Sequence, residues 1–315
     1  MATSVLETIA SGYNAAAGGS AVDTALPLRI GVRTVATLRR RLVRLRLPLE
    51  LALADSPPSL PPLAAEAHGY LVNALPERWA AGLAANQIEL RPFVRQRYRR
   101  SYARLDLGFD SWLAGFSSKS RSTLKRKVRR LAEASGGELD LRCFRSEAEI
   151  GEFHRLARSL SERTYQERLL GAGLPDGAAA LAGMQSLARR GLVRGWLLFL
   201  SGRPIAYLYA PAEGETLIYA HLGYDPDFAE LSPGTVLQLE AMRQLMDERA
   251  FRLFDFTEGD SEHKRRFATG GVDCVDLLLL RPTLGNLAVG RSLGTFDRAV
   301  AVAKSLCRAT GLIAR

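Results

Sequence analysis

The 315-residue sequence has few of the residues that build metal centres and disulfide frameworks. Its three cysteines, Cys143, Cys274 and Cys307, lie far apart and in none of the short spacings of a zinc site. We therefore expect free thiols in a reducing compartment. The four histidines are also scattered, so no metal cofactor is expected.

Long apolar runs and targeting signals are missing as well. No stretch approaches the roughly 20 apolar residues that cross a bilayer, and no basic-then-apolar signal peptide opens the sequence. We therefore expect a cytoplasmic protein, with a peripheral contact to the inner membrane as the alternative. A Walker lysine and a dinucleotide fingerprint are absent too, which excludes the common nucleotide-binding turns.

Acidic residues are outnumbered. The chain has 43 lysines and arginines against 33 aspartates and glutamates, a net charge of +10, which favours polyanions, anionic membrane surfaces or phosphorylated ligands. Hydrophobic residues make up 47% of the chain, so it should be globular, and its length allows two domains.

Acids are absent from residues 111–132, and the centre of this range is strongly basic. Apolar residues at i, i+4 and i+7 within residues 117–131 predict a helix with one narrow buried stripe. A serine at its start can cap the first turn, which directs backbone N–H groups and the positive helix end outward. Lys119 and Arg121 stand beside that end, a pattern typical of a phosphate or carboxylate site. A solvated basic face or a nucleic-acid patch has the same composition.

The first 62 residues give three expectations. Residues 1–26 are rich in Ala, Gly and Ser and are expected to be a flexible leader. Arginines interleave with apolar residues over 29–47, which predicts a basic amphipathic helix suited to an anionic membrane surface. An ordinary packed helix with an arginine-rich outer face is the alternative. The proline-rich residues 56–62 mark a linker or long loop.

Residues 70–107 indicate a small α+β subdomain, with a helix at 77–85 and strands near 87–94 and 101–107. Tyrosines alternate with arginines here, as they do in some single-strand nucleic-acid binders, although strand tyrosines usually belong to a core.

The remaining elements follow a clearer pattern. Strands are predicted at 139–145, 193–200, 204–211, 216–224, 251–257 and 272–280, and helices at 147–170, 178–190, 235–249 and 287–312.

The turn that enters the helix at 235–249 is the first candidate site. Ser232 is a good cap, Pro233 suits the first helical turn, and Gly234 permits close backbone approach. Strand-to-helix entries of this kind bind pyrophosphates through backbone N–H groups. The alternative is simply a well-capped helix.

The second candidate site is the charged loop after the apolar strand that ends near Asp255. Carboxylates crowd this loop at Glu258 and Asp260, and a basic run begins at Lys264 and Arg265. Clustered carboxylates can raise one another's pKa, as a general base requires, and a lysine can stabilise a developing oxyanion. A salt-bridged loop without catalysis has the same composition. One tyrosine hydroxyl on the central strands could protonate a thiolate leaving group, the candidates being Tyr207, Tyr209, Tyr219 and Tyr224.

These segments carry a resemblance that covers about residues 95–285. The order of elements from 139 to 281 resembles the GNAT acyltransferase superfamily. Four segments narrow it to the CelD/BcsL-type GNAT proteins of cellulose biosynthesis, relatives of the Fem-type aminoacyltransferases: residues 118–126, 223–226, 232–235 and 255–267.

The resemblance implies transfer of an acyl group from a CoA thioester to a primary amine. By this resemblance the donor pyrophosphate would be held by Ser232, Gly234 and Thr235. A phosphate or carboxylate of the acceptor would be bound by Lys119, Arg121, Arg126 and Arg265. Lys264 would stabilise the tetrahedral intermediate, and the base would come from the carboxylates Asp255, Glu258 and Asp260.

We therefore expect an α/β protein with a GNAT-like, mixed and mostly antiparallel sheet flanked by helices, and a partial GNAT-like N-terminal subdomain. The expected domains are a leader (1–26), an α+β subdomain (27–110), a GNAT acyltransferase domain (111–285) and a C-terminal amphipathic helix (286–315).

The predicted function is N-acylation of a cell-envelope polysaccharide or lipid precursor, with peripheral contact to an anionic membrane and no specific nucleic acid as partner. The alternatives are ceramide-forming acylation of a long-chain amino-alcohol and a non-catalytic basic protein that binds nucleic acid or assists exopolysaccharide assembly.

Overall fold

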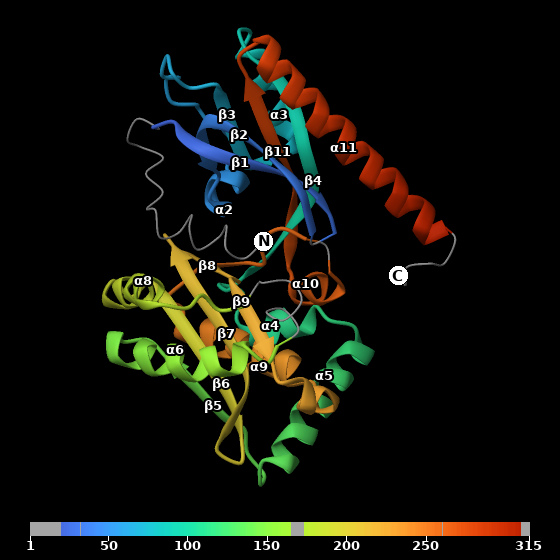
Figure 1. Ribbon diagram of the computed structural model, residues 1–315. Helices are drawn as coiled ribbons and strands as arrows, with labels where there is room; N and C mark the ends of the chain where they lie inside the picture. Colours follow the sequence, from blue (N-terminus) through green and yellow to red (C-terminus); the bar gives the residue numbers. More distant parts are fainter. Residues whose placement is uncertain (1–19, 32, 165–172, 260, 310–315) are drawn as a thin grey trace. The chain divides into compact units, whose positions relative to one another are not determined.

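The computed structural model describes residues 20–309 except 32, 165–172 and 260 (Figure 1). The described residues form two compact units. Residues 101–271 make up the first, which we call the central unit. Residues from 14–100 and 272–315 make up the second, which we call the flanking unit.

The central unit is built on a mostly antiparallel sheet. Its strands are β5 (Asp140–Phe144), β6 (Val193–Leu200), β7 (Arg203–Glu213), β8 (Thr216–Ile218), β9 (His221–Tyr224), β10 (Leu253–Asp255) and the end of β4 (Arg91–Arg104). Strands β5, β6 and β7 pair antiparallel in sequence, and β7 then pairs with both β8 and β9. Strand β8 pairs parallel with β10, which pairs antiparallel with β4.

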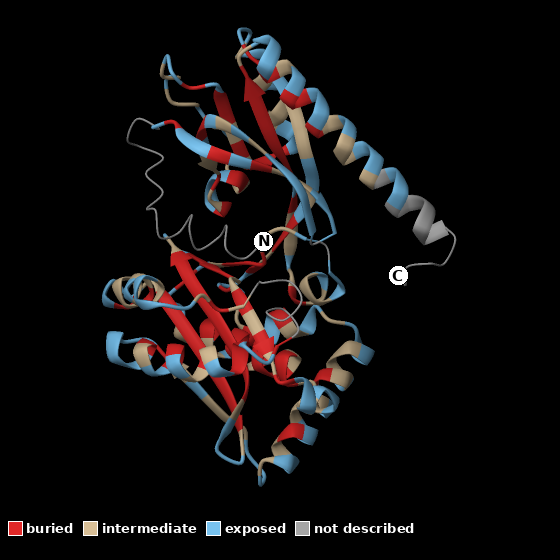
Figure 2. Ribbon diagram, in the orientation of Figure 1, coloured by how far each residue is buried: buried red, intermediate tan, exposed pale blue. Residues whose placement is uncertain are grey.

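Helices cover both faces of this sheet. They are α4 (Phe109–Ala114), α5 (Ser118–Ala134), α6 (Glu147–Ser161), α8 (Ala178–Arg189), the 3-10 helix η1 (Pro226–Leu231), α9 (Pro233–Glu248) and α10 (Glu262–Phe267). Alternate residues of β6 enter two cores. Trp196 and Leu198 pack in the core that holds the apolar faces of α4, α5 and α9, whereas Leu197 and Phe199 pack with α6 and α8. Figure 2 shows β6 and β7 as almost wholly buried, as a strand covered on both faces requires.

The flanking unit has a five-stranded sheet in the order β1-β2-β3-β11-β4. Its elements are β1 (Val22–Ile30), β2 (Arg33–Arg46), α2 (Leu49–Leu53), β3 (Gly69–Pro76), α3 (Glu77–Ala85), most of β11 (Gly270–Leu280) and α11 (Leu284–Ala309). Leu278 and Leu280 pack with α11, and Leu277 and Leu279 pack in the core that includes Leu83 of α3. No described helix is long and apolar enough to cross a membrane.

The fold class predicted from the sequence is confirmed. The chain is a mixed α/β protein with a mostly antiparallel sheet flanked by helices, and most predicted elements of the central unit lie where expected. Two predicted strands near 87–94 and 101–107 are one strand, β4, and the strand predicted at 216–224 is divided into β8 and β9. Residues 165–170 of the helix predicted at 147–170, and the end of the helix predicted at 287–312, lie outside the described residues.

The prediction of a basic amphipathic helix at 29–47 is wrong. These residues belong to β1 and to β2, which form an antiparallel hairpin. The β-branched residues Thr34, Val35 and Thr37 favour a strand, and Leu42 and Val43 are both fully buried because adjacent strand residues enter opposite cores. Strand β1 begins at Val22, so the expectation of a flexible leader is also wrong for residues 22–26.

Packing of the hairpin predicts that Leu42→Ala destabilises the protein strongly. Leu42 is fully buried between β1, β11 and α11, so its truncation should lower the free energy of unfolding by about 2–5 kcal/mol. The matched control Leu51→Ala, at a half-exposed position of α2, should change it by less than about 0.5 kcal/mol. Urea unfolding of the two variants checks this, and equal losses would contradict the strand assignment.

Candidate active site

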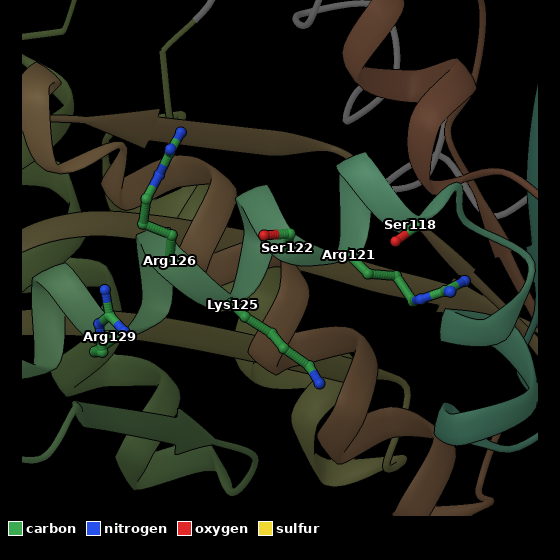
Figure 3. A pocket seen from close by; sticks show the side chains of 6 residues that line it. All are labelled: Ser118, Arg121, Ser122, Lys125, Arg126 and Arg129. Atoms are coloured by element: carbon green, nitrogen blue, oxygen red, sulfur yellow. The ribbon is translucent and has the colours of Figure 1, made fainter.

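The basic stretch forms α5, and its N-terminus is capped as predicted. Ser117 Oγ accepts a hydrogen bond from the backbone N–H of Ser120 at 3.2 Å. Residues of α5 line a pocket of about 470 Å³ (Figure 3), and they are Ser118, Arg121, Ser122, Lys125, Arg126 and Arg129. Cations and hydroxyls of this kind bind oxyanions through charge-assisted hydrogen bonds.

Three of the four cations expected at the acceptor site lie on α5, and they differ in their surroundings. Arg121 donates to the carbonyl oxygens of Ala114, at 3.1 Å, and of Phe116, so it also ties α5 to the end of α4. Arg126 and Lys119 are exposed and make no hydrogen bond or ion pair to a described residue. Of the predicted cations, only Arg121 and Arg126 are among the residues that line the pocket. The structure therefore brings two of the four predicted cations together at one surface.

The turn that enters α9 differs from the expected cap. Ser232 has a left-handed backbone (φ 54°, ψ 47°), and its side chain makes no capping hydrogen bond. A Cβ at Gly234 would lie 3.1 Å from Leu222 Cδ2 and 3.3 Å from a Tyr224 ring carbon. A side chain at this position would have to displace Leu222 or Tyr224 slightly, so the glycine suits the close packing of α9 on β9. The residues on either side of the buried Pro233–Gly234 pair, Ser232 and Thr235, remain partly exposed.

The parallel pair β8–β10 ends abruptly after Ile218 and Asp255. The last backbone hydrogen bond between the two segments runs from Tyr219 N–H to Asp255 O, at 2.8 Å. The next residue, Ala220, donates instead to Tyr209 O of β7, and β9 continues along β7. The pairing of β8 with β10 is therefore lost at the carboxyl end of β10, where parallel strands commonly present functional groups.

Asp255 and Thr257 shape the chain as it leaves β10. The Asp255 carboxylate is fully buried and accepts a hydrogen bond from Thr257 N–H at 2.8 Å. Thr257 has φ +62°, an unfavourable left-handed conformation for a β-branched residue. Strain of this kind costs about 1–3 kcal/mol and concentrates at functional sites.

Lys264 from α10 points back at this strained turn. Its Nζ donates to Glu258 O at 2.5 Å and lies 3.5 Å from Thr257 Oγ1. Burial lowers the pKa of Lys264, and the nearby carboxylates of Asp255 and Glu258 offset part of that effect. Predicted site residues Asp255, Glu258 and Lys264 thus lie together. Asp260 lies outside the described residues, and Arg265 is exposed on α10.

Two residues that the sequence did not single out complete the cluster. His263 Nε2 and Gln238 Oε1 are 2.5 Å apart, and Gln238 is fully buried on α9. The Gln238 Nε2 atom is also buried and has no hydrogen-bond partner among the described residues. Burial, together with Arg266, Lys264 and Lys127, lowers the pKa of His263 to about 4. A neutral imidazole is therefore present at ordinary pH.

Tyr219 connects these groups. Its ring centroid lies 6.4 Å from that of His263 and 5.9 Å from Lys264 Nζ. Enclosure of its hydroxyl raises the pKa of Tyr219, so the phenol stays protonated. Gly234 and Gln238 stand four residues apart, hence on one side of α9, which places the turn of α9 and the Lys264 cluster along the same helix. The only sequence signals for the two missed residues are a glutamine in a buried stretch of α9 and a histidine next to Lys264.

The low pKa of His263 predicts a specific pH dependence of stability. In the unfolded chain a histidine titrates near pH 6.5, so below that pH protons bind the unfolded state preferentially and stability falls until about pH 4. From pH 7 to pH 5 this linkage should remove about 2 kcal/mol from the free energy of unfolding.

In His263→Asn this part of the loss should disappear, whereas His68→Asn, which removes an exposed imidazole, should keep the wild-type loss. Urea unfolding at pH 7 and pH 5 measures both variants. A wild-type loss in His263→Asn would show that His263 is not held neutral.

Comparison with known proteins gives a match to one segment of the chain, which includes the turn of α9 and Lys264. Residues 118–265 match the family model described as Acetyltransferase (GNAT) domain, slightly less than half of the chain. A comparison with curated proteins gives no match.

Solved structures resemble the fold at low sequence identity. The crystal structure of FemX matches with a TM-score of 0.52 and 11% identity, over 89% of this chain and 95% of that chain. L-PGS from Bacillus licheniformis matches with a TM-score of 0.44 and 12% identity, over 74% and 73% of the two chains. A GCN5-related N-acetyltransferase from Kribbella flavida matches with a TM-score of 0.35 and 14% identity, over 69% and 71%. Residues 118–265, which contain α5, the turn of α9 and Lys264, thus match a GNAT acetyltransferase domain, and the chain has a GNAT-like fold similar to that of FemX.

Proposed function

We propose that this protein is an N-acyltransferase that moves an acyl group from an acyl-CoA thioester to a primary amine of a cell-envelope precursor. The observation that carries the proposal is Lys264, a partly buried ammonium held at the point where β8 and β10 separate, inside the segment that matches the GNAT model. The CelD/BcsL-type GNAT proteins remain the group that the sequence motifs resemble most.

The turn of α9 is the proposed donor site. Helix N-termini bind phosphates through backbone N–H groups and the helix dipole. The side chains that would flank a pyrophosphate, Ser232 and Thr235, are partly exposed, and Gly234 adds no side chain between them. The acyl group would then extend along α9 towards Gln238, whose buried amide N–H₂ has no partner among the described residues.

The proposed reaction uses the groups around Tyr219. The amine nitrogen attacks the thioester carbonyl carbon, and the electron pair of the carbonyl moves to its oxygen. The Lys264 ammonium stabilises that oxyanion. The oxyanion electron pair then re-forms the C=O bond as the C–S bond breaks, and the CoA thiolate takes the proton of the Tyr219 hydroxyl. The amine loses its proton to Glu258, and this proton returns through solvent to the Tyr219 oxygen, so both residues are restored.

The carboxylates have different proposed roles. Asp255 is fully buried and bonded to Thr257 N–H, so we assign it to holding the strained turn. Glu258 lies beside Lys264 and is the proposed base. His263 is assigned to orienting Gln238, because its Nε2 lies 2.5 Å from Gln238 Oε1.

An anionic group of the acceptor is proposed to bind at the pocket of α5. Arg121 and Arg126 line this pocket, and Lys119 and Arg265 are exposed cations of the same unit. Two amine probes separate the acceptor classes. A hexosamine phosphate represents a polysaccharide precursor, and a long-chain amino-alcohol represents a ceramide-forming reaction.

Removing the charge of Lys264 should abolish most of the turnover. Lys264→Met keeps the length and apolar character of the side chain, and loss of one oxyanion donor should lower kcat about 10²–10³-fold. The control Arg189→Met removes an exposed cation of α8 and should leave kcat unchanged.

Thiol release from acetyl-CoA and palmitoyl-CoA with each amine probe measures the rates. Unchanged turnover in Lys264→Met would contradict the proposed role. If the wild type turns over no combination of these donors and amines although the thermal test below shows that acyl-CoA binds, the proposed reaction is contradicted.

Donor binding should appear as thermal stabilisation. A ligand at 100 times its Kd adds about 2.7 kcal/mol to the folded state, so acyl-CoA should raise the Tm of the wild type. Gly234→Trp should remove the shift, because an indole there would displace Leu222 or Tyr224 and distort the turn of α9. Gly183→Trp on α8, where a Cβ meets nothing within 4 Å, is the matched control and should keep it. A Tm that responds to no CoA compound would contradict the CoA donor and favour an acyl-carrier protein or aminoacyl-tRNA.

A further inference from the structure

We propose that the flanking unit docks on an anionic lipid bilayer through the tip of its β1–β2 hairpin. The tip is defined here by Arg29 and Ile30 at the end of β1 and by Arg33 and Val35 at the start of β2. The proposal rests on charge and exposure within the flanking unit and does not depend on the proposed reaction.

The net positive charge of the chain is concentrated in this unit. Residues 14–100 and 272–315 contain 19 lysines and arginines against 9 aspartates and glutamates, a net charge of +10. Residues 101–271 contain 24 against 23, a net charge of +1. With the acidic Glu7 counted, the flanking unit therefore accounts for the whole net charge of +10, and the basic helix α5 is balanced by acids of its own unit.

Exposed apolar side chains are concentrated in the same unit. Among the described residues eight large hydrophobic side chains are exposed, and Leu107 alone belongs to the central unit. The others are Val22, Ile30, Val35, Leu51, Ile88, Leu284 and Val302. Ile30 is 56% exposed and Val35 is 61% exposed. A surface that joins apolar side chains to arginines suits the boundary between lipid headgroups and acyl chains.

The arginines of the tip are available for headgroups. Arg29 and Arg33 are exposed and make no hydrogen bond or ion pair to a described residue. The cations farther along β2 are engaged, since Arg39 pairs with Asp23 at 2.8 Å and Arg40 donates to Asn286 at 2.9 Å. Asp23, the only acidic residue of the hairpin, therefore lies at the end opposite the tip and is paired with Arg39.

Two other partners fit the hairpin less well. Residues 22–46 contain no aromatic side chain, so the hairpin offers no platform on which nucleic-acid bases could stack. Pro27 stands in the middle of the edge strand β1 and opposes strand addition by a second protein chain. Aliphatic side chains between unpaired arginines favour the bilayer.

Vesicle flotation with the full-length chain tests the proposal. The protein should bind vesicles of phosphatidylcholine with 30% phosphatidylglycerol and should not bind pure phosphatidylcholine at the same salt concentration. Each cation near an anionic surface contributes about fivefold in affinity, so Arg29→Gln/Arg33→Gln should weaken binding about 25-fold. Ile30→Ser/Val35→Ser should weaken it at least about tenfold. All four positions are exposed, so the variants should melt as the wild type does.

Matched changes in the central unit are the control. Leu107→Ser removes an exposed apolar side chain and Arg252→Gln an exposed cation, and both should bind as the wild type does. Equal binding to neutral and anionic vesicles, or wild-type binding by both tip variants, would overturn the proposal. So would binding to poly(U) RNA that is tighter than vesicle binding and unaffected by Ile30→Ser/Val35→Ser, because that result would identify a nucleic-acid surface.

Discussion

The separation of β8 from β10 is the constraint on which the rest of the central unit depends. The parallel ladder stops at the hydrogen bond from Tyr219 to Asp255, and the chain then follows β7 as β9. Backbone groups beyond that point need other partners, because buried N–H and C=O groups are rarely left unpaired. The Asp255 carboxylate supplies one of them by binding Thr257 N–H, and the resulting left-handed turn presents Glu258 O to Lys264.

Much of this arrangement follows from local sequence. Strand β6 lies where its continuous apolar run predicts it, the Ser117 cap forms, and the segment from Asp255 to Lys264 becomes a compact cluster. The sequence singled out the turn of α9 as a capped, phosphate-binding helix entry. In the structure Gly234 serves the close packing of α9 on β9. The site roles of Ser232, Gly234 and Thr235 stay predictions, as do those of the carboxylates.

The failures also have physical causes. Arginine and leucine alternate irregularly over 29–47, and this pattern is compatible with a helix. The pairing of β2 with β1 and β3 stabilises a strand instead. His263 and Gln238 stand 25 residues apart and meet only because α10 packs against α9. No spacing in a single sequence records such a contact. The confinement of the net charge to one unit became visible only when the fold showed that residues 14–100 and 272–315 share a sheet.

The central claim is that acyl-CoA binds between the turn of α9 and the end of β10. Hydrogen–deuterium exchange of the full-length chain with and without CoA tests this claim most directly, because bound ligand protects the backbone that it orders. The account predicts slower exchange in residues 219–238 and 253–267, with no change in residues 22–46 of the hairpin. Protection confined to α5 or to the flanking unit, or none at a CoA concentration that raises the Tm, would contradict it.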